Sequence, residues 1–352
     1  MAPGNAYSKS QAVNLYSDTQ TRPTAEMRAA IAAAEVGDEQ RMADPTTTAL
    51  EARVAELLGH EAAVFLPSGT MCNEIAIRLH IRPGGERMYL GRDTHPLIAE
   101  AGGPAQLSGA VITEVDGESG MFTPEALDAT IGAGGPGGRY AARPRLVCVE
   151  QTTNMGGGRV WALDQVRGVL DVARGHGLAT HLDGARLMNA VVASGVDAAT
   201  WAGGFDSAWL DFTKGLGAPV GACLAGSAAF IEEAWRWKQM LGGAMRQSGI
   251  VAAAGLHALD HHVERLADDH ARARRLAEGL GELPSVTIDP ATVETNIVIF
   301  DVPDAPAFTA ALAQRDVAMS HFGPTRMRAV THLDVDDAGI DQALAAAAEA
   351  LG

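Results

Sequence analysis

The stretch WLDFTKGLGAPVGA, residues 209–222, places a single lysine, Lys214, between an apolar run and a glycine-rich turn. Apolar surroundings disfavour the ammonium form of a lysine, and the free amine is a nucleophile for carbonyl groups. A lysine in a loop can instead extend its charged end into water. The stretch alone therefore allows both a reactive and a solvated lysine, and partners elsewhere in the chain must decide between them.

The sequence around this stretch alternates between helical and strand patterns from about residue 46 onward. Short apolar runs predict strands at AAVFL (62–66), RLVCVE (145–150), LATHLD (178–183) and SAWLDF (207–212). The segment of residues 162–177 between the second and third runs has a helical pattern. Continuous apolar strands separated by helices are typical of a mostly parallel sheet buried on both faces, so we expect an α/β fold.

The chain is longer than one hydrophobic core usually supports, which favours two domains. We expect residues 1–30 to form an N-terminal arm with a disordered start and residues 31–240 to form a large α/β domain. Residues 241–352 then form a smaller α+β domain. There a long helical segment leads into the strand-like runs SVTI (285–288) and TNIVIFD (295–301), and an alanine-rich helix follows them.

The composition excludes several classes of partner. The formal net charge of −16 repels nucleic-acid phosphates and anionic lipid surfaces, so neither nucleic acid nor membrane is expected to bind. No apolar run reaches transmembrane length and no signal peptide is evident, so we expect a cytoplasmic protein. Cys72, Cys148 and Cys223 lack metal or redox spacing and are expected to be small core residues. The histidines show no zinc-type spacing, and those at 257, 261 and 262 are expected on a solvated helix face.

Ligands of an open parallel sheet bind beyond the carboxyl ends of its strands. Ser68, Gly69 and Thr70 lie between a predicted strand and a helix, where free N–H groups hold a phosphate or simply cap the helix. Asp183 ends another strand, with His181 on the same side, and Lys214 follows the next strand.

A phosphate cradle, a strand-end aspartate and a strand-end lysine are together the parts that hold pyridoxal 5′-phosphate (PLP). They supply the anion clamp, the partner of the pyridinium nitrogen and the Schiff-base nitrogen. His95 follows another strand-like segment, so it is a candidate for stacking on the ring, although a structural role is also open. A nicotinamide-dependent dehydrogenase is disfavoured because the chain lacks a dinucleotide fingerprint.

Seven motifs spread between Asn14 and Asp334 resemble the L-threonine aldolase branch of the fold-type-I PLP enzymes, the β-eliminating lyase-like group. They are NLYSDTQTRPTAEMRAAI, VGDEQRMADPT, LPSGTMCNEIA, HLDGARLMNAVVASG, TKGLGAPVGA, LGGAMRQSGI and RAVTHLDV. The resemblance implies a mostly parallel, seven-stranded-type sheet in a large domain beside the smaller C-terminal one. It also implies a homodimer or homotetramer with shared active sites.

The resemblance further implies roles for individual residues. Lys214 is the Schiff-base lysine, Asp183 the pyridinium partner, and His95 the stacking and possible catalytic residue. The implied cofactor contacts also include Ser68, Gly69, Thr70, Arg186 and Thr213, with Arg246 reaching a phosphate in the neighbouring subunit. The substrate carboxylate is expected at Ser17, Arg186 and Arg328, where a guanidinium fork suits two carboxylate oxygens.

Three departures from the usual family pattern fall on the expected substrate side. Tyr16 precedes Ser17 where an arginine is usual, Arg41 takes the place of a tyrosine, and Thr153 takes the place of a histidine. We expect Arg41 and Thr153 to lie near the substrate and to shift preference toward polar or anionic β-substituents. Because threonine is not a base near neutral pH, His95 or an ordered water becomes the candidate base.

The expected activity is cleavage of a β-hydroxy-α-amino acid to glycine and an aldehyde. The substrate class covers threonine, allo-threonine and phenylserine-like amino acids. The alternative on the same scaffold is a PLP-dependent β-eliminating lyase or an aminotransferase.

Overall fold

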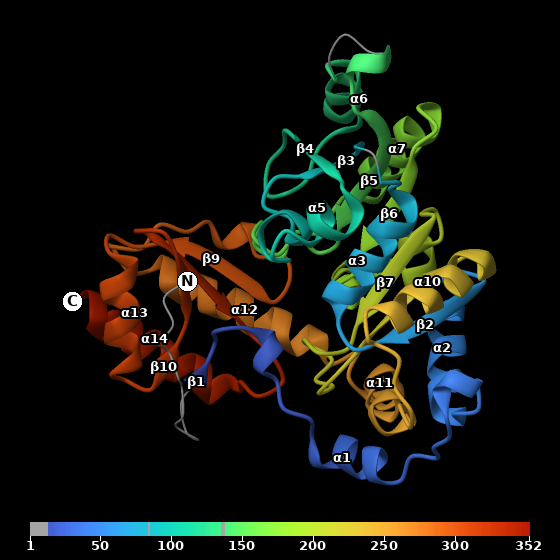
Figure 1. Cartoon of the computed structure of the whole chain (residues 1–352). Helices are drawn as coiled ribbons and strands as arrows, with labels where there is room; N and C mark the ends of the chain where they lie inside the picture. Colours follow the sequence, from blue (N-terminus) through green and yellow to red (C-terminus); the bar gives the residue numbers. More distant parts are fainter. Residues whose placement is uncertain (1–12, 84, 135–137) are drawn as a thin grey trace.

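The computed structural model describes residues 13–83, 85–134 and 138–352. Residues 1–12 of the predicted disordered start therefore lie outside the described residues. The chain folds around a seven-stranded sheet, and a second group of strands and helices lies beside it (Figure 1). In sheet order the strands are β2 (Ala62–Leu66), β8 (Ala222–Gly226), β7 (Ser207–Asp211), β6 (Ala179–Asp183), β5 (Arg143–Glu150), β3 (Glu86–Gly91) and β4 (Val111–Val115).

Only β8 runs against the other strands of this sheet, so the predicted mostly parallel α/β architecture is confirmed. The four predicted apolar runs correspond to β2, β5, β6 and β7. All five residues of β7 and four of the five in β6 are buried. These strands are buried because helices cover the sheet on both sides.

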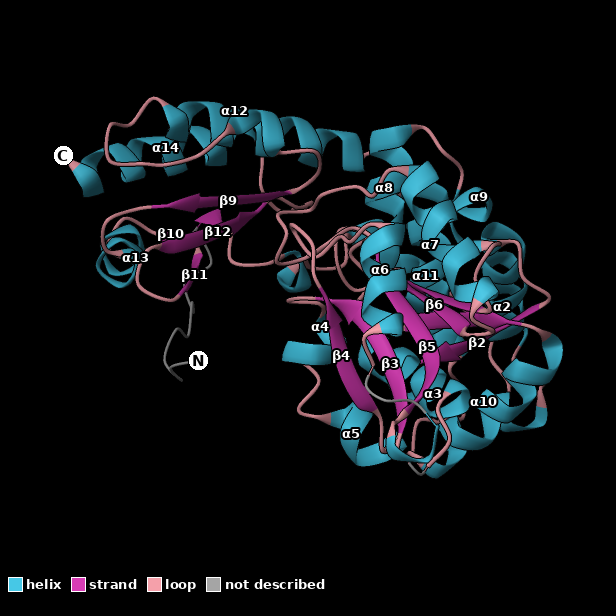
Figure 2. Cartoon of the chain, turned by 90° about the horizontal axis from the view of Figure 1, so that it is seen from above, coloured by secondary structure: helices cyan, strands magenta, loops and turns pink. Residues whose placement is uncertain are grey.

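Helices lie against both faces of the sheet, as Figure 2 shows from above. One face carries α3 (Gly69–His80), α5 (Gly103–Ser108) and α10 (Ala228–Met240). The helices of the other face are α2 (Pro45–Leu58), α6 (Pro124–Gly132), α7 (Leu163–Gly175), α8 (Leu187–Ser194), α9 (Ala198–Ala202) and α11 (Gly249–His261), with α1 (Ala25–Ala32) packed on α11. Short helical turns are α4 (His95–Ile98), η1 (Asp18–Gln20), η2 (Glu39–Arg41) and η3 (Gly138–Tyr140).

The limits of α2 follow directly from its sequence. Asp44 caps the helix by accepting a hydrogen bond from the Thr47 N–H at 2.9 Å, and Pro45 occupies the first helical position. Gly59 ends it with a φ of 70°, a left-handed conformation that glycine adopts without strain. Both ends of this helix therefore follow from local sequence.

The second group of elements has its own buried core. It contains the helices α12 (Leu266–Gly281), α13 (Ala305–Ala313) and α14 (Asp337–Leu351), the turn η4 (Pro290–Thr292), the antiparallel strands β9 (Ile297–Asp301), β12 (Arg326–Val330) and β11 (Ser320–Phe322), and the parallel pair β1 (Val13–Asn14) and β10 (Val317–Ala318). Its core includes Phe300, Phe308 and Met327. Val13 pairs with Val317, so the first described residues join the C-terminal elements.

The boundary between the two hydrophobic cores lies within α12. Leu266 belongs to the core around the large sheet, whereas Ala273 belongs to the core of the second group. Ala252, Ala254 and Ala258 of α11 also belong to the large-sheet core. The domain limits expected at residues 30 and 240 stay predictions.

Several local expectations can be compared with the structure. Cys72, Cys148 and Cys223 are free and buried, as expected. In SVTI only Thr287 pairs, in an isolated bridge to Asp301. The expectation of a solvated face is wrong for His262, which is buried and donates from Nδ1 to the Leu216 carbonyl oxygen at 2.7 Å. No helix in the described part of the chain is both long enough and apolar enough to cross a membrane.

Asn73 fastens α3 to the sheet through its side-chain amide. Its Nδ2 donates to Asp183 Oδ2 at 2.8 Å and to Glu100 Oε1 at 2.7 Å. Its Oδ1 accepts from Trp209 Nε1 at 2.7 Å and lies 3.1 Å from His181 Nε2. Both donors and both acceptor positions of the amide are therefore used, in a side chain that is fully buried.

We expect Asn73→Ala to lower the free energy of unfolding by at least about 3 kcal/mol, because four buried polar groups lose a partner at once. Chemical denaturation followed by circular dichroism measures the change. Asn189→Ala is the matched control, since Asn189 is also a buried helical asparagine but has one side-chain hydrogen bond, to His270. A loss for Asn73→Ala no larger than the control's loss of about 1 kcal/mol would contradict the expectation.

Candidate active site

The candidate site lies at the carboxyl ends of the parallel strands, around Lys214 and Asp183. Lys214 follows β7 by three residues, and its side chain is 17% exposed. Its Nζ forms an ion pair with Asp211, and the same Nζ lies 5.6 Å from the ring centroid of Trp209. The N–H and the hydroxyl of Thr213 both donate to Asp211 Oδ1 at 2.8 Å. Asp211 therefore holds the turn that presents the lysine amine.

Asp183 is the last residue of β6, and only 2% of it is exposed. Its Oδ2 accepts from Asn73, and its Oδ1 accepts from the Ala185 N–H at 3.1 Å. Burial raises the pKa of Asp183, although the His95 charge and the Asn73 hydrogen bond oppose the rise. A buried carboxylate of raised pKa is a suitable partner for a protonated ring nitrogen.

His95 opens α4, and two glutamates fix its position. Its backbone N–H donates to Glu150 Oε2 at 2.7 Å, and its Nδ1 lies 2.7 Å from Glu100 Oε1. Burial works against the imidazolium form, but the hydrogen bond to Glu100 and the Asp183 charge outweigh it and raise the pKa of His95. Because Glu100 occupies Nδ1, Nε2 is the ring nitrogen left to meet a ligand.

The predicted phosphate cradle is the first turn of α3. Ser68 caps the helix by accepting from the Met71 N–H at 3.2 Å, and Ser68 and Thr70 are both exposed. A Cβ on Gly69 would overlap the indole of Trp209, so this position requires glycine. The first N–H groups of the helix have no partner within the helix and are available to an anion.

The two arginines expected at a substrate carboxylate differ in their present partners. Arg186 is buried and forms a bidentate pair with Asp18, from Nε at 2.8 Å and from Nη2 at 2.7 Å. Although burial acts in the opposite direction, Arg186 holds the pKa of Asp18 well below its usual range. The guanidinium of Arg186 is therefore already occupied by a carboxylate of the chain itself.

Arg328 on β12 is buried, and its Nε has no hydrogen-bond partner within the described residues. Burial and the nearby Arg186 charge lower the pKa of Arg328 to about 10, so it stays charged at neutral pH. A buried cation with unused donors is the feature that an incoming carboxylate requires. Of the two arginines, Arg328 is the one available to the substrate.

Ser17 and Thr153 are both buried. The hydroxyl oxygen of Ser17 accepts from the Thr19 N–H at 3.2 Å and caps η1, next to Asp18. The hydroxyl of Thr153 has no hydrogen-bond partner among the described residues, although its backbone N–H bonds the Arg159 carbonyl oxygen at 3.2 Å. Their expected contacts with the substrate stay predictions.

Arg41 is the last residue of η2, and Arg246 lies on the loop before α11, which hydrogen bonds connect to η2. A fully buried ion pair joins Glu39 to Lys238 at 3.0 Å, and the Glu39 N–H donates to the Arg246 carbonyl oxygen at 2.9 Å. Arg246 is 64% exposed and pairs with Asp38 at 3.1 Å. Arg41 is exposed as well. In the described part of the chain, neither arginine has a hydrogen bond or ion pair with Lys214, Asp183 or His95.

Sequence reasoning missed five side chains that shape this site. Asp18, Asn73, Glu100, Glu150 and Asp211 are buried or nearly so, and each bonds a predicted site residue. Two of them carried a signal, because Asp18 adjoins Ser17 and Glu150 opens the EQTTN motif that contains Thr153. Asp211 and Glu100 lie three residues before Lys214 and five residues after His95, but their side-chain contacts were not anticipated, and Asn73 lies 110 residues from Asp183.

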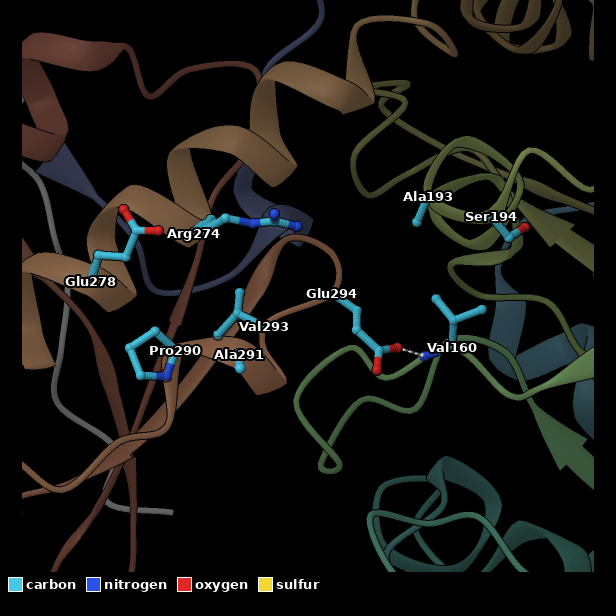
Figure 3. A pocket seen from close by; sticks show the side chains of 9 residues that line it. All are labelled: Val160, Ala193, Ser194, Arg274, Glu278, Pro290, Ala291, Val293 and Glu294. Atoms are coloured by element: carbon cyan, nitrogen blue, oxygen red, sulfur yellow. Dashed lines mark hydrogen bonds between the residues drawn. The ribbon is translucent and has the colours of Figure 1, made fainter.

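A separate cavity of about 660 Å³ lies between α8 and the elements α12 and η4 (Figure 3). Arg274 and Glu278 project into it from α12, and Glu294 accepts a hydrogen bond from the Val160 N–H at 2.7 Å on its other side. None of the predicted site residues lines this cavity. The candidate active site is therefore distinct from it.

The residues at the strand ends fit PLP. Lys214 would provide the amine, Asp183 the buried carboxylate and the start of α3 the phosphate donors, and the Asp183 charge acts on His95. The Nε of Arg328 is a buried polar atom that has no hydrogen-bond partner among the described residues.

Comparisons with known proteins agree with this arrangement. The family model described as Beta-eliminating lyase matches residues 14–303. A probable low-specificity L-threonine aldolase 2 of Arabidopsis thaliana is 40% identical over 94% of this chain and 95% of its own length. The low specificity L-threonine aldolase of Escherichia coli K12 is 39% identical, with coverages of 92% and 94%.

Solved structures show the same fold. The Leishmania major threonine aldolase superposes with a TM-score of 0.83 at 18% identity and covers 96% of this chain and 99% of its own. A putative L-allo-threonine aldolase of Listeria monocytogenes has a TM-score of 0.79 at 20% identity and covers 96% of each chain. The sequence matches go further than the fold: the chain belongs to the β-eliminating lyase family.

Proposed function

We propose that this chain is a PLP-dependent lyase that cleaves a β-hydroxy-α-amino acid to glycine and an aldehyde. The observation that carries the proposal is a group of three cationic side chains around Asp18. The charges of Arg186, Lys214 and Arg328 all act on the Asp18 carboxylate. A carboxylate held by Arg328 would thus place an α-amino acid beside the lysine amine. The relatives named threonine aldolases support this substrate class. A cytoplasmic location remains part of the proposal.

Each side chain of the site has a role that follows from its position. Arg328 binds the substrate carboxylate, and Asp183 holds a proton at the ring nitrogen. When bound, PLP draws away the electron pair that remains on Cα when the Cα–Cβ bond breaks. His95 Nε2 accepts the proton of the β-hydroxyl as the aldehyde leaves, and Glu100 stabilises the resulting imidazolium through Nδ1. Return of a proton to Cα completes glycine.

The test of this proposal is a product assay with threonine, allo-threonine and phenylserine. Glycine and an aldehyde are the expected products. A keto acid with ammonia would show β-elimination instead, and a keto acid with an aminated acceptor would show amino transfer. Borohydride reduction before peptide mapping should leave the cofactor on Lys214. The chain has only two other lysines, Lys9 and Lys238, and Lys238 is buried against Glu39. Cofactor on either of them would overturn the assignment.

We expect Arg328→Lys to lower kcat/KM for threonine by about tenfold to a hundredfold, because an ammonium replaces a planar fork and loses a charge-assisted contact of about 1.5–3 kcal/mol. Steady-state kinetics measure the change. Arg326→Lys is the matched control on the same strand, since Arg326 is exposed and pairs with Asp301 at 3.3 Å. Equal effects of the two substitutions would remove Arg328 from the substrate site.

We also propose a homodimer or homotetramer with shared sites, in which Arg246 serves a neighbouring copy. Two observations support the shared site. The Arg246 side chain is exposed, and in the described part of the chain it has no hydrogen bond or ion pair with Lys214. Refolding Arg246→Ala with Lys214→Ala chains should restore about a quarter of wild-type activity, because half of the random dimers are hybrids with one native site of two.

Mixing Lys214→Ala with Asp183→Ala is the control for this experiment. Both residues come from one chain in one site, so no hybrid of these two variants holds a native site. Recovery in the control, or no recovery with Arg246→Ala, would contradict the shared site.

A further inference from the structure

Behind His95 lies a pair of glutamates that the proposed chemistry leaves unexplained. The side chain of Glu100 is fully buried, and its Oε1 receives both His95 Nδ1 and Asn73 Nδ2 at 2.7 Å. Its Oε2 is buried and has no hydrogen-bond partner within the described residues. The same holds for both carboxyl oxygens of Glu74, one position after Asn73 on α3. Three buried carboxyl oxygens therefore lack a donor.

The surroundings leave Glu74 little besides Glu100 to bond. On one side its carboxyl lies against Gly103 at the start of α5, where an added Cβ would overlap it. Glu100 is the neighbouring carboxyl whose charge acts on Glu74. Two ionised carboxylates are both acceptors and cannot bond each other. A proton on one of them turns the contact into a hydrogen bond and satisfies an oxygen on each.

The charges around His95 show where that proton lies. The ionisable groups that face the imidazole are Glu100 from the loop before α5, Glu150 at the end of β5 and Asp183 at the end of β6. Glu100 already accepts two N–H groups, which stabilise its anionic form, whereas Glu74 accepts none. Burial raises the pKa of Glu74 to about 8, and Glu100 adds to the rise. The proton therefore resides on Glu74 at neutral pH.

We propose that Glu74 and Glu100 hold one proton between them and act as the positioning pair that fixes the orientation and the charge of the His95 imidazole. Glu74 donates to Glu100 Oε2, and Glu100 stays an anion that accepts from His95 Nδ1. The anion on Nδ1 makes Nε2 a stronger base and directs it away from the pair. The kinetic consequence rests on the proposed function, in which Nε2 takes the β-hydroxyl proton.

The direct test is the titration of His95 by NMR in the full chain labelled at histidine, with and without PLP. The signal that His95→Asn removes identifies the residue. In the wild type we expect a second inflection near pH 8, where Glu74 loses its proton. Glu74→Gln supplies a permanent neutral donor, so the second inflection should vanish while the acid dissociation constant of His95 changes less than about twofold.

Glu100→Gln removes the anion and should raise the acid dissociation constant of His95 at least about tenfold. Glu51→Gln is the matched control: Glu51 is a buried glutamate whose pKa burial raises to about 7, but it bonds the Phe65 N–H. It should leave the His95 titration unchanged. If Glu74→Gln changes the acid dissociation constant of His95 tenfold, Glu74 is ionised in the wild type. If Glu100→Gln leaves that constant unchanged, Glu74 and Glu100 do not act on His95 as a pair. Either result overturns the proposal.

Two further measurements keep the proposal falsifiable. If Glu74→Gln does not fold, infrared spectra of wild-type protein with labelled glutamate must show a protonated carboxyl at pH 7, and its absence overturns the pair. In kinetics, Glu100→Gln should lower kcat about tenfold or more with KM nearly constant. If the wild-type protein forms neither glycine nor an aldehyde, the proposed function is wrong. The NMR titration tests the Glu74–Glu100 pair independently of that result.

Discussion

The amide of Asn73 is the constraint on which the rest of the site depends. Its Nδ2 must donate, to Asp183 and Glu100, so its Oδ1 must accept. His181 therefore carries its proton on Nε2, and its Nδ1 accepts from the Ser207 hydroxyl at 2.8 Å. Ser207 in turn receives His80 Nε2 at 2.8 Å. One amide thus sets the direction of every hydrogen bond from the far end of α3 to the Asp183 carboxylate.

This chain of hydrogen bonds requires both histidines to be neutral. Burial lowers the pKa of His181 to about 3 and that of His80 to about 4, so neither competes with Asp183 for a proton near neutral pH. The charges of the site are kept elsewhere, on His95, the lysine and the arginines. The side of Asp183 that holds His181, Ser207 and His80 is therefore polar but uncharged, whereas the Glu100 carboxylate shares the Asn73 amide with Asp183.

Sequence patterns predicted the parts of this molecule that depend on local order. The apolar runs located β2, β5, β6 and β7, and the strand ends located Asp183 and Lys214. The same patterns did not reveal Asn73 or Glu100, because Asn73 meets Asp183 across 110 residues and nothing near it in sequence indicates that contact. His262 was misplaced for the same reason, since its partner Leu216 lies 46 residues away. Pairing between distant side chains has no periodic signature.

Two aspartates hold different parts of the site through contacts of very different sequence separation. Asp211 holds the lysine turn from two and three residues away, whereas Asp18 reaches Arg186 across 168 residues and Asn296 across 278. Contacts of long sequence separation must close a larger loop of chain than local contacts, so they form more slowly. The turn that holds Lys214 can therefore form before Asp18 reaches Arg186. Cleavage of the chain near residue 20 would free Asp18 from Arg186 and Asn296 and leave the contacts of Asp211 with the Lys214 turn in place.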